Sequence, residues 1–319
     1  MESNIVRPKS LPTPLLLIAP FFLWGTAMVA MKGVMSSTTP LFLASVRIAP
    51  AGLLVLVVAA IMGKSQPQGW RAWLWIVLFS LVDGTLFQGF LAEGLARTSA
   101  GLGSVAIDSQ PLIVALLSWW FYQERIGWRG WLGLGLGILG ISAIGLPEAW
   151  IGAWLGGEPQ TVEIGQLFEG GLWLMLLASV SMAVGTVMMP KVAQYVDPVV
   201  ATGWHLVLGG LPLLAMSAAW ESQQWVNIDG WGWCAIVYST VFGSAIAYGL
   251  FFFFASKGNL TSLSALTFLT PVFALLFGNL FLAEVLTLLQ WIGVSIALVG
   301  IWLIERVDRS QMEEPVKTL

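Results

Sequence analysis

Long apolar stretches alternate with short polar segments along almost the whole chain. Each stretch has about the 20 residues that an α-helix needs to cross the hydrocarbon core of a bilayer. The pattern therefore predicts an all-α integral membrane protein with ten transmembrane helices. The predicted helices cover residues 14–34, 40–62, 72–92, 101–122, 127–146, 171–190, 199–219, 231–254, 260–282 and 286–304.

The second half of the chain repeats the first. A shift of 160 positions, without a gap, brings identical residues of 100–145 and 260–301 together. The matched pairs include Ser104 with Ser264, Pro111 with Pro271, Glu124 with Glu284, Trp131 with Trp291, Gly133 with Gly293 and Gly140 with Gly300. Such residues at fixed spacing in an apolar background indicate an internal duplication. We therefore divide the chain into a first repeat at 14–146, a loop at 147–170, a second repeat at 171–304 and a tail at 305–319.

The duplication has a consequence for topology. Each predicted repeat holds five helices, an odd number, so the second repeat enters the membrane from the opposite face. Two inverted repeats are typical of secondary transporters, whose substrate site lies near the bilayer midplane between the halves. The sequence thus predicts alternating access between the halves, in a coupled transporter, an exchanger or a passive facilitator. The lack of a G-x-x-x-x-G-K-[ST] loop argues against an ATP-driven pump.

Positive charge is distributed unevenly between the two faces of this predicted topology. With a cytoplasmic N-terminus, eleven of the 14 Lys and Arg residues fall in inside segments: Arg7, Lys9, Lys64, Arg71, Arg125, Arg129, Lys191, Lys257, Arg306, Arg309 and Lys317. Lys32 and Arg97 fall outside. Because basic residues concentrate on the cytoplasmic side, we expect a protein of the cytoplasmic membrane with both termini in the cytoplasm and the 147–170 loop outside.

Composition narrows the chemistry and the partners. Of the 319 residues, 57% are hydrophobic and 10% are charged, against about 25% charged in soluble domains. One cysteine, Cys234, excludes an internal disulfide, and a single histidine argues against a His/Cys metal site. A net charge of −3 provides no basic field for nucleic acid. We expect no cofactor, a small-molecule substrate and the lipid bilayer as partners, and a monomer or homodimer.

Four ionisable residues fall well away from the ends of predicted helices, where charge is costly and often functional. They are Arg47, Asp83, Asp108 and His205. Asp83 or Asp108 can bind a substrate ammonium group or carry a coupling proton, and no cation lies at the depth of Asp83 in its own half. Arg47 and Asp108, at similar depths, belong either to a substrate site or to a buried pair that fixes packing. His205 is either a proton relay or a packing residue.

Polar and helix-breaking residues accompany these charges. Four intramembrane polar residues are Gln88, Gln110, Ser244 and Tyr248. They either line the same cavity or join helices through hydrogen bonds. Pro111 and Pro271 lie inside predicted helices, where proline frees a carbonyl and kinks the helix. These kinks serve either a rocking motion or static packing.

Two further features have a structural interpretation. Glu124 and Glu284 lie just before a predicted helix, where a carboxylate favours the positive helix N-terminus. The glycines at Gly133, Gly137 and Gly140 form a smooth face for close helix contact. We expect this face to pack within the fold, with a homodimer seam as the alternative.

Residues in both repeats match a known family pattern. They are Trp24-Gly25, Lys32, Pro40 and Arg47, then Thr98-Ser99-Ala100, Pro111, Glu124, Gly133 and Gly140, and in the second copy Pro271, Glu284, Gly293 and Gly300. On these residues the chain resembles the EamA-type transporters of the drug/metabolite transporter superfamily, over about residues 14–304. The resemblance implies a ten-helix protein that exports or exchanges small metabolites, amino acids or amphipathic compounds.

The second repeat departs from this pattern. Val184 stands where the first repeat has Trp24, and His205 stands where it has Arg47. Asp83 and Asp108 lie outside the pattern, so these positions are the candidates for the specificity of this chain. The alternatives from other classes are a membrane-embedded enzyme, which the near absence of His and Cys disfavours, and a structural membrane protein that transports nothing.

Overall fold

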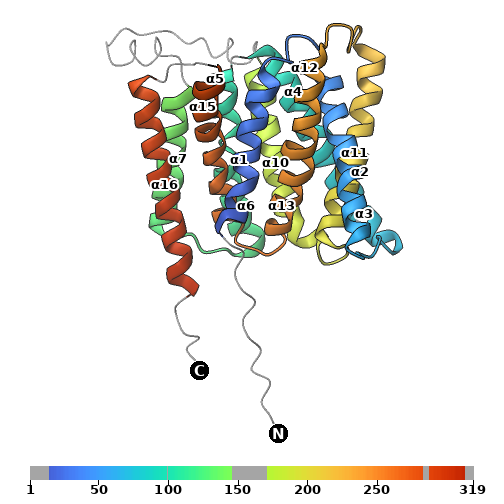
Figure 1. The fold of residues 1–319 in the computed structure, drawn as a ribbon. Helices are drawn as coiled ribbons and strands as arrows, with labels where there is room; N and C mark the ends of the chain where they lie inside the picture. Colours follow the sequence, from blue (N-terminus) through green and yellow to red (C-terminus); the bar gives the residue numbers. More distant parts are fainter. Residues whose placement is uncertain (1–13, 99, 146–170, 283–286, 313–319) are drawn as a thin grey trace.

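The structure is a computed structural model and describes residues 14–98, 100–145, 171–282 and 287–312 (Figure 1). All regular secondary structure in these ranges is helical. The helices stand side by side and roughly parallel to one another. The first helix begins, and the last helix ends, on the lower side in Figure 1.

The helices of the first half are α1 (Pro14–Lys32), α2 (Pro40–Ile61), α3 (Gly69–Phe79), η1 (Ser80–Phe87), α4 (Gln88–Arg97), α5 (Ala100–Ile107), α6 (Gln110–Tyr122) and α7 (Trp128–Gly145). Those of the second half are α10 (Leu172–Val192), α11 (Pro198–Trp220), α12 (Gly230–Tyr238), η2 (Ser239–Ile246), α13 (Ala247–Ala255), α14 (Leu260–Ala265), η3 (Leu266–Phe268), α15 (Leu269–Leu282) and α16 (Leu288–Met312).

Among the described residues, seven helices are long and apolar enough to cross a membrane. Two shorter apolar helices, Leu15–Met31 and Leu288–Ile304, are the first and the last along the described chain. The helix bounds follow the predicted ranges closely, whereas the number of membrane crossings stays a prediction. One difference concerns the last helix: α16 runs to Met312, whereas the sequence predicted this helix to end at residue 304 and the tail to begin at residue 305.

Two long helices contain a π-helical segment at the same place in each half. The first is η1, inside the continuous helix of α3 and α4, and the second is η2, inside the helix of α12 and α13. Each segment has a glycine as its fifth residue, Gly84 and Gly243. Gly84 packs on the backbone of Gly209 in α11, where an added Cβ would lie 2.7 Å from the Gly209 Cα. Short π segments are frequent at functional sites.

Two further helices are interrupted next to a proline. α5 ends at Ile107 and α6 begins at Gln110, one residue before Pro111. In the second half, the 3₁₀ segment η3 separates α14 from α15, which contains Pro271. Proline lacks an N–H group and its ring clashes with the carbonyl four residues earlier, so the regular helix cannot continue there.

The two halves pack against each other through glycine faces. Figure 1 shows α7 beside α16 and α2 beside α11, and both pairs are in close contact. An added Cβ on Gly133 would lie 2.6 Å from the Gly300 carbonyl oxygen, and one on Gly52 would lie 2.6 Å from the Gly203 carbonyl oxygen. The glycine face of α7 therefore packs within the fold, as the sequence predicted.

Charged residues near the ends of helices form hydrogen bonds and an ion pair between the two halves of the chain. Glu221, just after α11, accepts hydrogen bonds from the backbone N–H groups of Leu41 and Phe42 at the start of α2. At the end of α2, Lys64 forms an ion pair with Asp197, the N-cap of α11, at 3.0 Å. Carboxylates at helix N-termini satisfy N–H groups that have no partner within the helix.

Glu124 also acts at a helix N-terminus, but not at that of the next helix. Its Oε2 accepts hydrogen bonds from the hydroxyl of Thr261 at 2.8 Å and from the Thr261 N–H at 3.4 Å. Thr261 belongs to the first turn of α14, in the other half. Glu124 is therefore a helix-end group, as expected, but the helix is α14 of the other half and not the helix that follows Glu124 in the chain. Glu284 lies outside the described residues.

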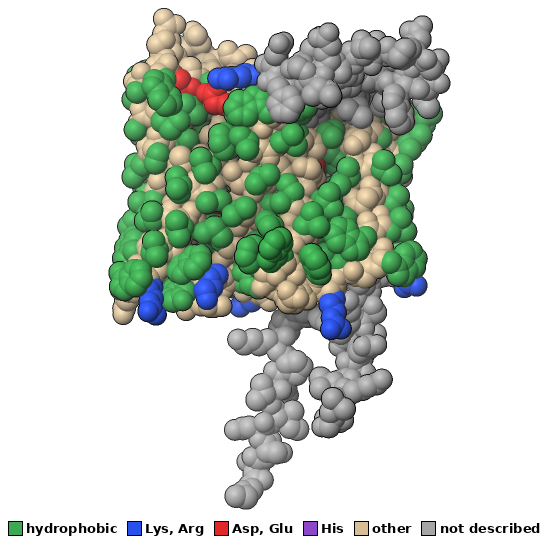
Figure 2. All heavy atoms as spheres, turned by 180° about the vertical axis from the view of Figure 1, so that it is seen from behind, with side chains coloured by type: hydrophobic (Ala, Val, Ile, Leu, Met, Phe, Trp, Pro, Cys, Tyr) green, Lys and Arg blue, Asp and Glu red, His purple; other side chains and the backbone are tan. Residues whose placement is uncertain are grey.

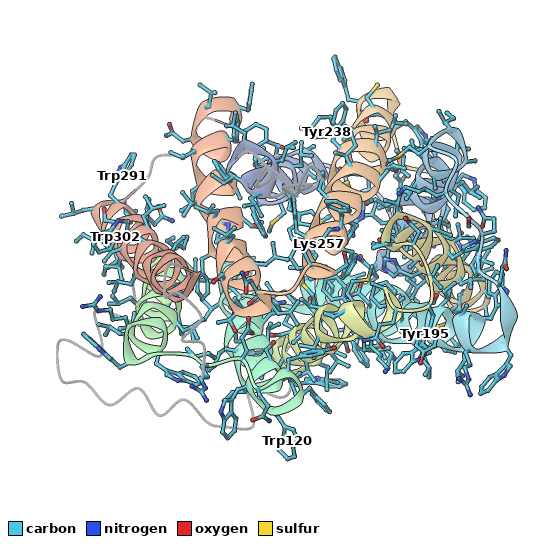
Figure 3. The ribbon with its side chains drawn as sticks, turned by 90° about the horizontal axis from the view of Figure 1, so that it is seen from below. Trp120, Tyr195, Tyr238, Lys257, Trp291 and Trp302 are labelled. Carbon is cyan, nitrogen blue, oxygen red and sulfur yellow. The ribbon has the colours of Figure 1, made fainter. Side chains whose placement is uncertain are left out.

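The outer surface is apolar between two polar rims. Figure 2 shows hydrophobic side chains over the middle of one face and Lys and Arg side chains along its lower edge, the side where α1 begins. The tryptophans near helix ends are exposed: Trp70, Trp73, Trp119, Trp120, Trp128, Trp131, Trp220, Trp225 and Trp231. Figure 3 shows Trp120 and Trp291 pointing away from the bundle. This distribution suits a helix bundle in a bilayer with an aromatic belt.

The Glu221 contact predicts a difference between two glutamates. Glu221→Ala leaves two N–H groups of α2 without an acceptor, so we expect a loss of about 2 kcal/mol of stability. Glu93→Ala removes an exposed i,i+4 pair with Arg97 and costs less than about 0.5 kcal/mol. Thermal unfolding of both variants in the same detergent measures the difference. Equal losses would contradict the capping role of Glu221.

Candidate functional site

A buried acid and a buried imidazole meet between the two halves. Asp83 lies in η1 and His205 in α11, and the distance from Asp83 Oδ2 to His205 Nε2 is 3.0 Å. Both side chains are 0% exposed. The sequence showed no cation for Asp83 within its own half, and the structure supplies the partner from the other half. Asp83 is thus paired rather than isolated.

The hydrogen bonds of His205 determine what this contact can hold. Nδ1 lies 2.8 Å from the Thr202 carbonyl oxygen, which only accepts, so Nδ1 carries a hydrogen. One proton then lies between Nε2 and the Asp83 carboxylate, bound to either atom. The pair is neutral in both arrangements. Loss of that proton would leave one negative charge buried in the bundle.

A second hydrogen-bonded chain runs beside this pair. Arg47 of α2 donates from Nη2 to Oε1 of Gln88 at 2.6 Å, and Gln88 of α4 donates from Nε2 to the Tyr248 hydroxyl at 2.6 Å. Tyr248 belongs to α13, so this chain also joins the two halves. The alternative of an ion pair between Arg47 and Asp108 is wrong, because the ion pairs among the described residues do not include one.

Aromatic rings hold the two sets together. The His205 ring stacks on Phe79 at 4.3 Å between centroids, and its centroid lies 6.4 Å from that of Tyr248. Phe252 packs against both His205 and Tyr248, at 5.2 and 5.9 Å. We call the five residues Arg47, Asp83, Gln88, His205 and Tyr248 the polar cluster. Apolar walls lower the local dielectric, so charges in this cluster interact strongly.

The remaining predicted residues fall elsewhere. Asp108 is buried at the break between α5 and α6, and no hydrogen bond or ion pair joins it to another described residue. Gln110 donates to the Thr186 hydroxyl at 3.4 Å. Ser244 of η2 is fully buried with its hydroxyl unpartnered. No group of three His, Cys, Asp or Glu side chains within the described ranges is placed to hold a metal ion.

One residue of the site was missed at the sequence level. Gly185 of α10 lies against Asp83, and an added Cβ there would be 2.5 Å from Asp83 Oδ1. At Gly25, the equivalent residue 160 positions earlier, an added Cβ would lie 2.6 Å from the Phe273 Cβ and 2.9 Å from the Thr270 carbonyl oxygen. Both repeats have glycine at this position, and that coincidence in the sequence could have indicated close packing at Gly25 and Gly185.

The family model for the EamA-like transporter family matches residues 11–146 and 169–306. The chain belongs to the EamA-like transporter family. The match covers both halves, which contain the interrupted helices and the π segments. The chain is therefore a multi-pass membrane protein of a transporter family.

Relatives of this EamA-like chain include two at high identity. The uncharacterized transporter sll0355 of Synechocystis sp. is 62% identical over 301 residues, which cover 94% of this chain and 91% of the relative. The WAT1-related protein At3g02690, chloroplastic, of Arabidopsis thaliana is 48% identical, over 90% of this chain and 68% of the relative. A solved crystal structure at 18% identity has a TM-score of 0.77 and covers 94% of this chain and 98% of its own, which supports the fold.

The contact between Gly185 and Asp83 predicts the effect of one methyl group. Gly185→Ala places that methyl against the carboxylate, so η1 has to move and we expect a loss of about 1–3 kcal/mol. Gly249→Ala is the matched control, because nothing lies within 4 Å of the added Cβ, and there we expect no loss. Thermal unfolding of the two variants tests this. A tolerated Gly185→Ala would contradict the packing around Asp83.

Proposed function

We propose that the chain is a secondary transporter that moves small metabolites, amino acids or amphipathic organic compounds, by alternating access, as an exporter or exchanger. The observation that carries this proposal is the polar cluster, whose hydrogen bonds join helices of the two halves inside the membrane. Polar groups at such depth are costly and mark substrate or ion pathways. A rearrangement of one half against the other changes these contacts directly.

The proposal includes ten membrane crossings in two inverted five-helix repeats. It is supported by the π segments η1 and η2 and by the helix breaks at Pro111 and Pro271, which recur at the same place in each half. Discontinuous helices near the midplane are common at the binding sites of repeat-built transporters. Both termini then lie in the cytoplasm of a cytoplasmic membrane, on the side of the basic rim in Figure 2.

The polar cluster is largely closed in this structure. Asp83, Gln88, His205 and Tyr248 are at most 4% exposed. Substrate entry therefore requires helices to separate around the cluster. The interrupted helices supply places where a helix can bend without breaking a regular run of hydrogen bonds.

The Asp83 and His205 pair is the proposed site of a coupling proton. Its single shared proton can leave only at the cost of one buried negative charge. Binding of a charged substrate, or opening of the site to water, changes that cost. The free-energy cost of the buried negative charge thus links proton release to substrate movement.

Flux across liposomes tests the proposed function against its alternatives. The purified full chain is reconstituted into liposomes preloaded with a panel of amino acids, organic acids and organic amines, and uptake of each labelled solute is followed. We expect uptake stimulated by at least one solute on the opposite side, as in an exchanger or exporter running in reverse. No flux above protein-free liposomes would favour a structural protein, and chemical conversion of a solute would favour an enzyme.

Coupling gives a separate prediction for Asp83. Asp83→Asn removes the shared proton, so accumulation driven by a pH gradient should be lost, while exchange at equal pH continues. Uptake measured over a series of external pH values should lose its pH dependence in this variant. Glu93→Gln alters a half-buried carboxylate that pairs with Arg97 outside the polar cluster, so it is the control and should behave as the wild type. An unchanged pH profile in Asp83→Asn would remove the pair from coupling.

A further inference from the structure

Arg47 of α2 has no carboxylate against it in the described part of the chain. Its Nη2 bonds to the neutral amide oxygen of Gln88, and the ion pairs of the structure leave it out. Asp83 is already committed to His205. A guanidinium inside a membrane bundle is costly without a counter-charge. The surroundings of Arg47 therefore lack an anion.

Unused hydrogen-bond donors are found on Arg47 and on residues linked to it. Four donors have no acceptor among the described residues: Nε of Arg47, Nε1 of Trp24, Oγ of Ser244 and the hydroxyl of Tyr248. Tyr248 connects them, because Gln88 bridges it to Arg47, its ring centroid lies 5.2 Å from that of Trp24, and Ser244 precedes it by four residues on the same helix. Buried donors normally have partners, so this group is incomplete as it stands.

We propose that these four donors bind the carboxylate of an amphipathic organic anion. The inference rests on the proposed transport function and names its substrate class. A carboxylate only accepts hydrogen bonds, has about four acceptor positions on two oxygens, and can bind a guanidinium through two parallel bonds. It would supply both the missing acceptors and the missing negative charge. Gln88 then releases Nη2 of Arg47 to the bound anion.

The walls beside the donors suit the apolar part of such a molecule. The Trp24 ring packs against Phe21 and Phe251, with centroids 5.7 and 5.2 Å away. Trp24 and Arg47 are only partly buried as residues, but Nε1 of Trp24 and Nε of Arg47 are buried. The anion therefore reaches these donors when helices separate around the polar cluster. An aromatic or aliphatic body can lie against these rings while its carboxylate meets the donors.

Three probes with one body and different head groups test this site. The full-length protein in lipid nanodiscs is titrated at pH 7 with phenylacetate, phenylacetamide and phenethylamine, and thermal unfolding is followed, since a ligand stabilises the folded state that binds it. We expect phenylacetate to raise the Tm and to bind about tenfold or more tightly than the amide, because charge-assisted bonds are roughly twice as strong as neutral ones. Equal binding of the amide, preference for the amine, or no binding by any probe would overturn the proposal.

Two substitutions locate the effect. Arg47→Gln should abolish the preference for phenylacetate over phenylacetamide, whereas Arg71→Gln, at an exposed arginine beside Trp70, should leave it unchanged. Arg47→Lys keeps the positive charge but loses the planar guanidinium that can form two parallel hydrogen bonds. It should therefore weaken phenylacetate binding while phenylacetate still binds more tightly than phenylacetamide. This variant is used if Arg47→Gln does not fold. A preference that survives in Arg47→Gln overturns the proposal. Liposome flux of neutral or cationic solutes with no flux of carboxylates would also overturn it, while leaving the transport function in place.

Discussion

The contact between Asp83 and His205 is the interaction on which the arrangement of the two halves depends. A carboxylate buried this completely needs a partner, because an isolated ion in a low-dielectric interior is too costly. The partner lies on α11, so η1 must pack directly on α11. Gly84 and Gly209 allow their backbones to meet, and Gly185 of α10 leaves room for the carboxylate. Small residues around the pair are therefore a consequence of its burial.

The second chain, through Arg47, Gln88 and Tyr248, differs in its charge balance. The acid and imidazole of the first pair are neutral together, whereas Arg47 meets only neutral groups. The first pair is thus balanced in charge, although Oδ1 of Asp83 has no hydrogen-bond partner among the described residues, whereas the second chain carries an unbalanced positive charge. We infer that the Asp83 and His205 pair responds to protons and that the chain through Arg47 responds to substrate. Phe252 packs against both His205 and the Tyr248 ring, so it connects the two.

The sequence predicted the helices better than it predicted the contacts between them. Apolar runs place helix ends within a few residues, and Pro40 and Pro198 begin α2 and α11 as the first helical residue. The pairing of Asp83 could not be predicted, since its partner lies 122 positions away on the other repeat. Likewise, the partner of Glu124 proved to be α14, because docking of the halves, not chain order, decides which helix end is nearest.

The single histidine of the chain allows a direct measurement of the central contact. Nitrogen-15 NMR of histidine-labelled protein, purified without a histidine tag in nanodiscs, reports only His205. We predict a protonated Nδ1 and an Nε2 signal that changes strongly in Asp83→Asn but not in Glu93→Gln. An Nε2 signal that is the same in the wild type and in Asp83→Asn would contradict a buried proton-sharing pair between the two halves.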